Sequence, residues 1–109
     1  MRPSPSPFWQ TAALLCLGLA ASHAAHANPA LARKQGCLGC HAVASKLVGP
    51  AYVEVAAKYG NDKAAIADLA KSIRAGGSGK WGDMAMPPQG QLSDADARRL
   101  ATWILNGAK

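Results

Sequence analysis

The chain has 109 residues and carries 12 Lys and Arg against 6 Asp and Glu, a formal net charge of +6 at pH 7. Its basic residues never run together in more than a pair and its N-terminus predicts export, so nucleic acid is the weakest candidate partner. A positive excess of this size is common on a small solvated surface, and it is also compatible with an anionic membrane or an acidic protein partner.

The first 27 residues have the pattern of a secretory signal peptide. Residues 12–21 form an apolar run that is too short for a permanent membrane-spanning helix, and the tripeptide Ala-His-Ala that follows suits signal peptidase. We therefore predict cleavage after Ala27, with Ala24 as the alternative site, and a single periplasmic domain over residues 28–109. Cys16 is interpreted as an ordinary signal-peptide residue. An uncleaved leader that acts as a membrane anchor is the alternative.

Cleavage changes the inventory of reactive side chains. Removing 27 residues leaves 82, with 11 basic and 6 acidic side chains and a net charge of +5. The remaining histidine, cysteines and methionines are His41, Cys37, Cys40, Met84 and Met86. A domain of this size has a thin apolar core, and a large planar apolar cofactor would supply the missing part.

Four helices and no strand are expected, which places the domain in the all-α class. A first helix is predicted to have Asn28 as its cap and Pro29 as its first residue, and to run to near Gly36. A second helix begins after Pro50 and carries apolar side chains at helical spacing until Gly60 ends it.

The third and fourth helices each combine a capping residue with one apolar face. Asn61 or Asp62 caps the third helix, which the sequence Ala-Gly-Gly at 75–77 ends, and Ser93 caps the fourth, which Gly107 ends. The predicted buried faces are Ile66, Leu69, Ala70 and Ile73 in the third helix and Leu100, Trp103 and Ile104 in the fourth.

Residues 76–92, which we name the methionine loop, contain five glycines and two prolines in seventeen residues. No regular helix or strand tolerates that density, so a long loop is expected. Long loops in compact domains are usually functional or disordered, and the presence of Trp81, Met84 and Met86 favours an ordered, functional loop.

The sequence GCLGCHAV at 36–43 contains two thiols separated by two residues, with a histidine directly after the second. Cys37 and Cys40 lie one helical turn apart and can reach the same flat partner, toward whose centre His41 can point. A thioredoxin-like pair would follow a strand, which is not predicted here, and a zinc site would need a second ligand pair, which the chain lacks. A disulfide leaves the histidine unexplained. The motif therefore predicts a covalently bound haem.

The predicted axial ligands of the haem iron are chosen from the side chains of residues 28–109 that can bind a metal. His41 is its only imidazole, so it is the predicted proximal ligand. A lysine in the sixth position would have to lose its proton, whereas a methionine thioether would not, and both candidate methionines stand in the methionine loop. Met86 is favoured over Met84 because Pro87 and Pro88 restrict the backbone directly after it.

Three segments, GCLGCHAV, VGPAYVEVAAKY and KWGDMAMPPQGQLSDADARRLATWIL, resemble the small bacterial class I cytochromes c that donate electrons to periplasmic nitrite reductase and terminal oxidases. The likeness covers nearly all of residues 29–106. It implies four short helices around one haem with thioethers to Cys37 and Cys40, His41 as proximal and Met86 as distal ligand. It further implies that the Pro50 carbonyl accepts the other imidazole N–H and that the Trp81 indole donates to a haem propionate.

The resemblance implies a monomeric periplasmic electron carrier that is not an enzyme, has no permanent membrane anchor and binds no nucleic acid. Its donor would be a membrane quinol-oxidising complex or similar, and its acceptor a nitrite reductase or terminal oxidase. Electrons would cross an exposed haem edge near Cys37, Val48 and Pro87, flanked by Lys46 and Lys80. Two alternatives are a peroxidase or nitrite-reducing domain, which needs an acid or base beside an open distal site, and a gas sensor or fixed subunit of a larger complex.

Three residues depart from the family pattern. Gln89 stands where an asparagine often contacts the methionine sulfur, and Ser72 where a cationic side chain often approaches a propionate. Ala32 replaces an aromatic residue and is expected to thin the packing against Trp103. The first two are expected to change how the haem potential is tuned.

Overall fold

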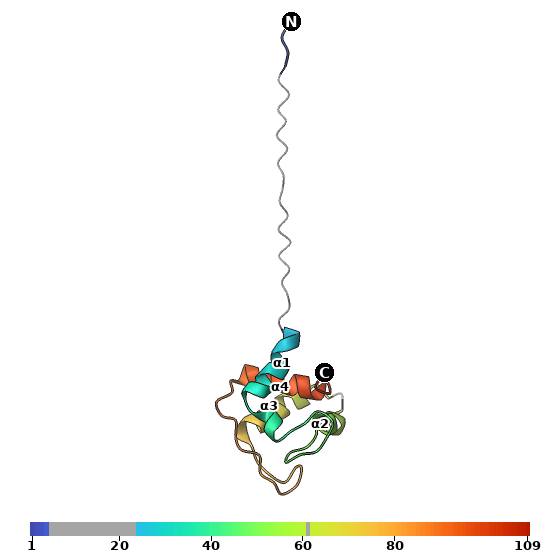
Figure 1. Ribbon diagram of the computed structural model, residues 1–109, viewed down its shortest axis with the longest axis vertical. Coiled ribbons are helices and arrows are strands. Elements are labelled where there is room, and N and C mark those ends of the chain that lie inside the picture. The colour runs from blue at the N-terminus through green and yellow to red at the C-terminus, as the bar shows by residue number, and fades with distance from the viewer. Residues whose placement is uncertain (5–23, 61) are drawn as a thin grey trace.

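The computed structural model describes residues 1–4, 24–60 and 62–109 (Figure 1). These residues form α1 (Ala24–Lys34), a short 3-10 helix η1 (Cys37–Gly39), α2 (Tyr52–Tyr59), α3 (Ala65–Ala75) and α4 (Asp94–Leu105). The described part of the chain contains no β-strand, which confirms the all-α prediction. None of the helices described is long and apolar enough to cross a membrane. Most of the predicted signal peptide, Cys16 included, lies outside the described residues.

Helix α1 begins earlier than the sequence pattern predicted. It starts at Ala24 and contains Pro29, so the prediction that Asn28 caps the helix is wrong. Proline lacks a backbone N–H and removes one helical hydrogen bond, but the alanines before it are strong helix formers and add a turn. After the helix, Gly36 adopts a left-handed conformation with φ 75°, which turns the chain into η1 and places Cys37 directly after α1.

Helices α2 and α3 are joined by a short connection whose ends are fixed by local chemistry. Gly60 ends α2 as predicted, with a φ of 59° that a side chain would disfavour. The Asp62 carboxylate accepts a hydrogen bond from the Ala64 N–H, but α3 starts at Ala65, so Asp62 shapes the turn before the helix and is not its cap. Asn61, the alternative cap, lies outside the described residues.

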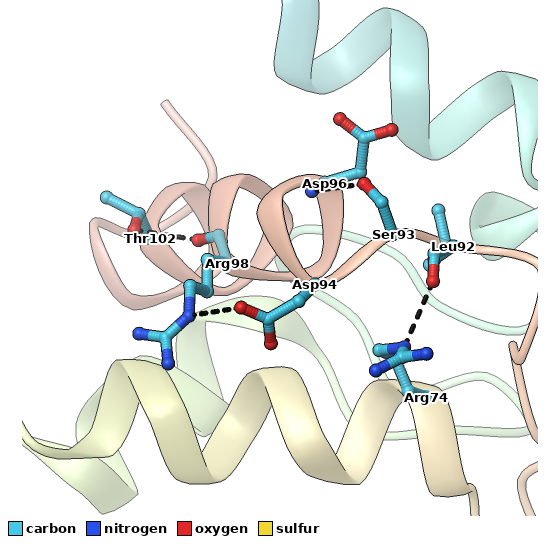
Figure 2. Close-up of polar contacts among 7 residues, drawn as sticks. All are labelled: Arg74, Leu92, Ser93, Asp94, Asp96, Arg98 and Thr102. Atoms are coloured by element: carbon cyan, nitrogen blue, oxygen red, sulfur yellow. Dashed lines mark hydrogen bonds and ion pairs between the residues drawn. The ribbon is translucent and has the colours of Figure 1, made fainter.

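Helix α4 is the element around which the others pack, since it contacts α1, α2 and α3. Its start is the predicted one: the Ser93 hydroxyl accepts from the Asp96 N–H at 3.1 Å (Figure 2). Arg98 pairs with Asp94 on the same helix at 2.8 Å, and both side chains are exposed (Figure 2). Such exposed pairs add little stability, typically ~0.3–0.5 kcal/mol each.

The apolar faces of the helices meet in one core, which is Ala32, Tyr52, Val55, Leu69, Ala70, Ile73, Leu92, Ala97, Leu100, Ala101, Trp103 and Ile104. The predicted faces of α3 and α4 are therefore confirmed, except that Ile66 is only partly buried. Ala32 is fully buried in the same cluster as Trp103, although its side chain is short. Burial of each large side chain contributes about 1.5–3 kcal/mol.

The methionine loop connects α3 to α4 and extends from the helices at the lower end of the view in Figure 1. It contains no helix, as predicted, but it is held at several points by backbone contacts. The Gln89 N–H donates to the Ile73 and Arg74 carbonyls, and the Arg74 side chain donates to the Leu92 carbonyl at 3.0 Å (Figure 2). The loop is thus tied to the end of α3.

Candidate functional site

A cavity is lined by residues from the η1 region, α2, α3, α4 and the methionine loop. Every residue that the sequence assigned to the cofactor lines it: Cys37, Cys40, His41, Pro50, Trp81 and Met86. Apolar side chains of the core, among them Leu69, Ile73, Leu100 and Ile104, form another part of its wall. The fold therefore brings four separate sequence segments to one apolar space.

The His41 imidazole is fixed in one orientation and one tautomer. Its Nδ1 donates to the Pro50 carbonyl oxygen at 2.8 Å, as the resemblance implied. Because a carbonyl oxygen can only accept, Nδ1 carries the proton, and Nε2 has a free lone pair for a metal. The bond also orients the ring and raises its basicity as a ligand.

Two neighbours of His41 that the sequence analysis did not single out complete its support. The Tyr52 ring stacks on the imidazole, with centroids 5.2 Å apart and planes 15° from parallel. Gly49 lies so close that a Cβ at this position would come within 2.9 Å of Nδ1 and Nε2. The segment Gly-Pro-Ala-Tyr thus contributes a glycine for close approach, a carbonyl acceptor and an aromatic face to the same imidazole.

The two thiols of the motif differ in their surroundings. Cys37 is half-buried and Cys40 is exposed, and no disulfide joins the two. Burial raises the pKa of the Cys37 thiol, although hydrogen bonds from its backbone and from the Tyr52 hydroxyl act in the opposite direction. The pKa of Tyr52 is also raised, first by burial and then by the neighbouring Cys37. The Tyr52 hydroxyl therefore keeps its proton at neutral pH.

Met86 and Met84 both line the cavity but are held differently. Met86 exchanges two backbone hydrogen bonds with Gly77, at 3.0 and 2.8 Å, in an isolated antiparallel bridge. Its side chain is partly buried and packs against the core, whereas that of Met84 is 69% exposed. The bridge fixes the position of Met86 within a loop that otherwise has no regular structure.

The Trp81 indole is partly buried in the cavity wall and carries a cation on its face. The Lys58 ammonium lies 4.4 Å from the ring centroid and donates to the Lys80 carbonyl at 3.2 Å. Lys80 in turn donates to the Ser72 hydroxyl at 3.1 Å. Lys58 was not among the predicted site residues, and no local pattern marks it, because its partners lie more than twenty residues away.

Gln89, one of the three departures from the family pattern, is engaged outside the cavity. Its side-chain amide donates to the Pro87 carbonyl at 3.3 Å, and its carbonyl oxygen accepts from Gln91 at 2.9 Å. Gln89 does not line the cavity, whereas Met86 does. In this arrangement the amide braces the backbone after Met86.

The donors in the cavity fit a metal held in a macrocycle. In the described residues no three His, Cys, Asp or Glu side chains group closely enough to hold an ion themselves. A haem iron takes at most two ligands from protein. The cavity supplies an imidazole nitrogen, thioether sulfurs, two thiols for attachment and apolar walls, so the residues present fit a covalent haem.

Comparison with known proteins agrees with this fit. The cytochrome c family model matches residues 27–108. Cytochrome c-552 of Hydrogenobacter thermophilus is 51% identical over 80 residues, which are 73% of this chain and 81% of that protein. Cytochrome c-551 of Allochromatium vinosum is 49% identical over 79 residues, 72% of this chain and 84% of that protein.

The fold is similar to that of solved structures as well. The crystal structure of wild-type Nitrosomonas europaea cytochrome c552 superposes with a TM-score of 0.69 at 48% identity, covering 72% of this chain and 98% of that one. The chain belongs to the cytochrome c family, among its small class I members. It is accordingly an electron carrier with one c-type haem bound covalently through cysteines, and not an enzyme.

Proposed function

We propose that this protein is a periplasmic single-electron carrier whose haem has histidine and methionine axial ligands. The observation that supports this most directly is the shared cavity of His41 and Met86, in which Nε2 of His41 is left free by the bond to Pro50. In this proposal the carrier moves electrons from a respiratory-chain donor, such as a membrane quinol-oxidising complex, to a terminal reductase or oxidase such as nitrite reductase.

Each residue of the site has one task in this proposal. Cys37 and Cys40 form the thioethers, His41 presents Nε2 to the iron, and Met86 presents its sulfur. When bound, the haem supplies reversible one-electron redox chemistry at its iron. His41 and Met86 would hold the iron from the protein, so that little would rearrange with the change of charge, and Trp81 would donate its indole N–H to a haem carboxylate.

The surface around the cavity supports docking to larger redox proteins. Leu47 and Val48 are each 50% exposed, and Val48 and Pro87 belong to the cavity lining. Lys46 stands beside them in the same exposed loop. A small apolar patch with lysines around it favours weak, salt-sensitive binding to an acidic partner, which suits a monomeric carrier that must dissociate quickly.

We further propose that residues 1–27 are removed on export and that residues 28–109 form the working domain. Cleavage after Ala27 would remove the first turn of α1 and leave Asn28 and Pro29 as its first residues, where both are favourable. Mass spectrometry of the exported protein tests this: the expected mass is that of residues 28–109 plus one haem, with no free thiol. A product that retains the leader or a free thiol contradicts it.

The visible spectrum of the purified ferric protein tests the ligation. A carrier with methionine on the iron is expected to show the methionine-to-iron charge-transfer band. A high-spin spectrum would instead favour the alternatives with an open distal site, which are a peroxidase, a nitrite-reducing domain or a gas sensor. The domain has no second histidine to serve such a site as acid or base.

A further inference from the structure

Lys80 lines the haem cavity, Lys58 lies next to it over the Trp81 ring, and the contacts of both ammonium groups are with neutral partners. Lys80 donates to the Ser72 hydroxyl at 3.1 Å, and Lys58 donates to the Lys80 carbonyl at 3.2 Å and lies over the Trp81 ring. Within residues 24–60 and 62–109, the ion pairs are Arg98 with Asp94 and Arg99 with Asp96, both on α4. Neither lysine is thus neutralised by a carboxylate of the described chain.

The chemistry of the cofactor provides the missing negative charge. A c-type haem is attached through what were its vinyl groups, and its two carboxylates project from the opposite edge of the macrocycle. Ser72, Lys80 and Trp81 all line the same cavity as the attachment cysteines, although they are at least 32 positions away in sequence. A carboxylate that reaches this wall would meet an ammonium and an indole N–H, both of which are donors.

We propose that Lys80, whose ammonium donates to the Ser72 hydroxyl, binds a haem carboxylate in this protein. Position 72 on α3 is a serine and carries no charge, so in this proposal the positive charge comes from Lys80 in the methionine loop. This inference rests on the proposed haem site, and Lys80 is not among the residues assigned to the cofactor there. The Ser72 hydroxyl orients the ammonium, and Lys58 holds the backbone that carries it.

The charges around this point are consistent with such a role. The hollow adjoining Ser72 and Lys80 is also lined by Lys71, Tyr59 and Asp68, so cations outnumber carboxylates there. A charge-assisted hydrogen bond between an ammonium and a carboxylate is roughly twice as strong as a neutral one. The Lys80 ammonium would therefore donate to the carboxylate, either in place of the Ser72 hydroxyl or in addition to it. Its charge would then no longer be available to attract a redox partner.

Nuclear magnetic resonance of the ferrous holoprotein tests the contact directly. The expected result is a nuclear Overhauser effect between the Lys80 side-chain methylene protons and the methylene protons of one haem propionate. The absence of that effect, with the Lys80 side chain assigned and its other contacts observed, overturns the proposal.

Midpoint potentials provide the second test. Lys80→Gln is expected to shift the potential downward, because an uncompensated carboxylate stabilises the ferric state. Lys63→Gln, which removes the same charge from an exposed position that does not line the cavity, is the matched control and is expected to shift it less. Equal shifts in the two variants overturn the proposal.

A charge swap separates pairing from general electrostatics. Ser72→Lys combined with Lys80→Gln returns a cation to the same wall from α3, and the double variant is expected to recover most of the wild-type potential. If it behaves like Lys80→Gln alone, the proposal is wrong. The charge-transfer band of the wild type is recorded alongside: its absence contradicts the axial-ligand assignment, whereas its presence with no effect at Lys80 contradicts only this inference.

Discussion

At the scale of single residues, the two methionines of the methionine loop differ in how firmly their backbone is held. Met86 and Met84 have the same chemistry and stand two positions apart, so an extended backbone points both side chains to the same face, and both line the cavity. The bridge to Gly77 and the two prolines after Met86 restrict only one of them. A ligand whose backbone is already ordered loses less entropy when its sulfur binds.

The first prediction compares Met86→Ala with Met84→Leu. Met86→Ala is expected to lower the midpoint potential, abolish the charge-transfer band and let cyanide or imidazole bind readily, because a sulfur that favours ferrous iron is lost. Met84→Leu, at a position that is 69% exposed, is expected to leave all three properties nearly unchanged. Potentiometry and visible titrations measure them. Loss of the band in the Met84 variant alone would show that the assignment is shifted by two residues.

Some contacts of the site were predictable from the sequence, and others were not. The Cys-x-x-Cys-His motif and the bond from His41 to the Pro50 carbonyl were accessible because the participants are close in sequence or follow a known pattern. The stacking of Tyr52 on His41 was missed because its helical spacing already explained it as a core residue. The contact of Lys58 with Trp81 joins residues 23 positions apart, and no local pattern predicts such a pair.

At the scale of elements, the start of α4 and the end of α2 were predictable from a polar cap and a glycine, whereas the starts of α1 and α3 were not. Ser93 and Gly60 act where local chemistry requires them, since a hydroxyl satisfies a free N–H and a positive φ favours glycine. The start of α1 depends on a balance between alanine propensity and the single hydrogen bond that Pro29 removes. A sequence pattern that places proline at the first helical position does not weigh these two effects against each other.

The second prediction concerns the junction of α3 with the methionine loop. Gly76 has a φ of 65°, and a Cβ there would lie 2.7 Å from the Pro88 nitrogen and 2.8 Å from the Pro87 carbonyl carbon. Gly76→Ala is therefore expected to destabilise the holoprotein by about 1–3 kcal/mol, and to shift the segment that carries Met86. Denaturant unfolding measures the first effect and the charge-transfer band the second.

Gly90→Ala is the control for this prediction, because it makes the same chemical change in the same loop. Among the described atoms, a Cβ at Gly90 would meet nothing within 4 Å, and its φ is not in the positive range. This variant is expected to be as stable as the wild type within about 0.5 kcal/mol, or slightly more stable. If Gly76→Ala matched it in both stability and spectrum, close packing at the junction would not be what holds the loop.

At the scale of the whole molecule, the apolar core and the cavity share part of their lining. The described residues form one modest apolar core, and part of its surface faces the cavity through Leu69, Ile73, Leu100 and Ile104. A planar apolar group there would fill the cavity that these buried side chains border, which fits the expectation that so short a domain needs support beyond its apolar core. Chain length alone indicated this need. Which core residues border the cofactor could be learned only from the packing of the helices.

The last prediction follows from the charge of the whole domain. After loss of residues 1–27 the formal charge is +5, and charges on the surface act over about 10 Å at 0.1 M ionic strength. The rate of electron transfer to an acidic redox partner is therefore expected to fall as salt rises, because the attraction that speeds encounter is screened. Stopped-flow measurement of the bimolecular rate across an ionic-strength series checks this.

Matched lysine variants locate the charge that matters for encounter. Lys46→Gln, beside the exposed Leu47 and Val48, is expected to slow the reaction at low salt and to flatten the salt dependence. Lys109→Gln removes the same charge at the C-terminus, outside the cavity lining, and is expected to have a smaller effect. A rate that stays constant from low to high salt in the wild type would mean that docking is apolar and that the positive surface serves only solubility.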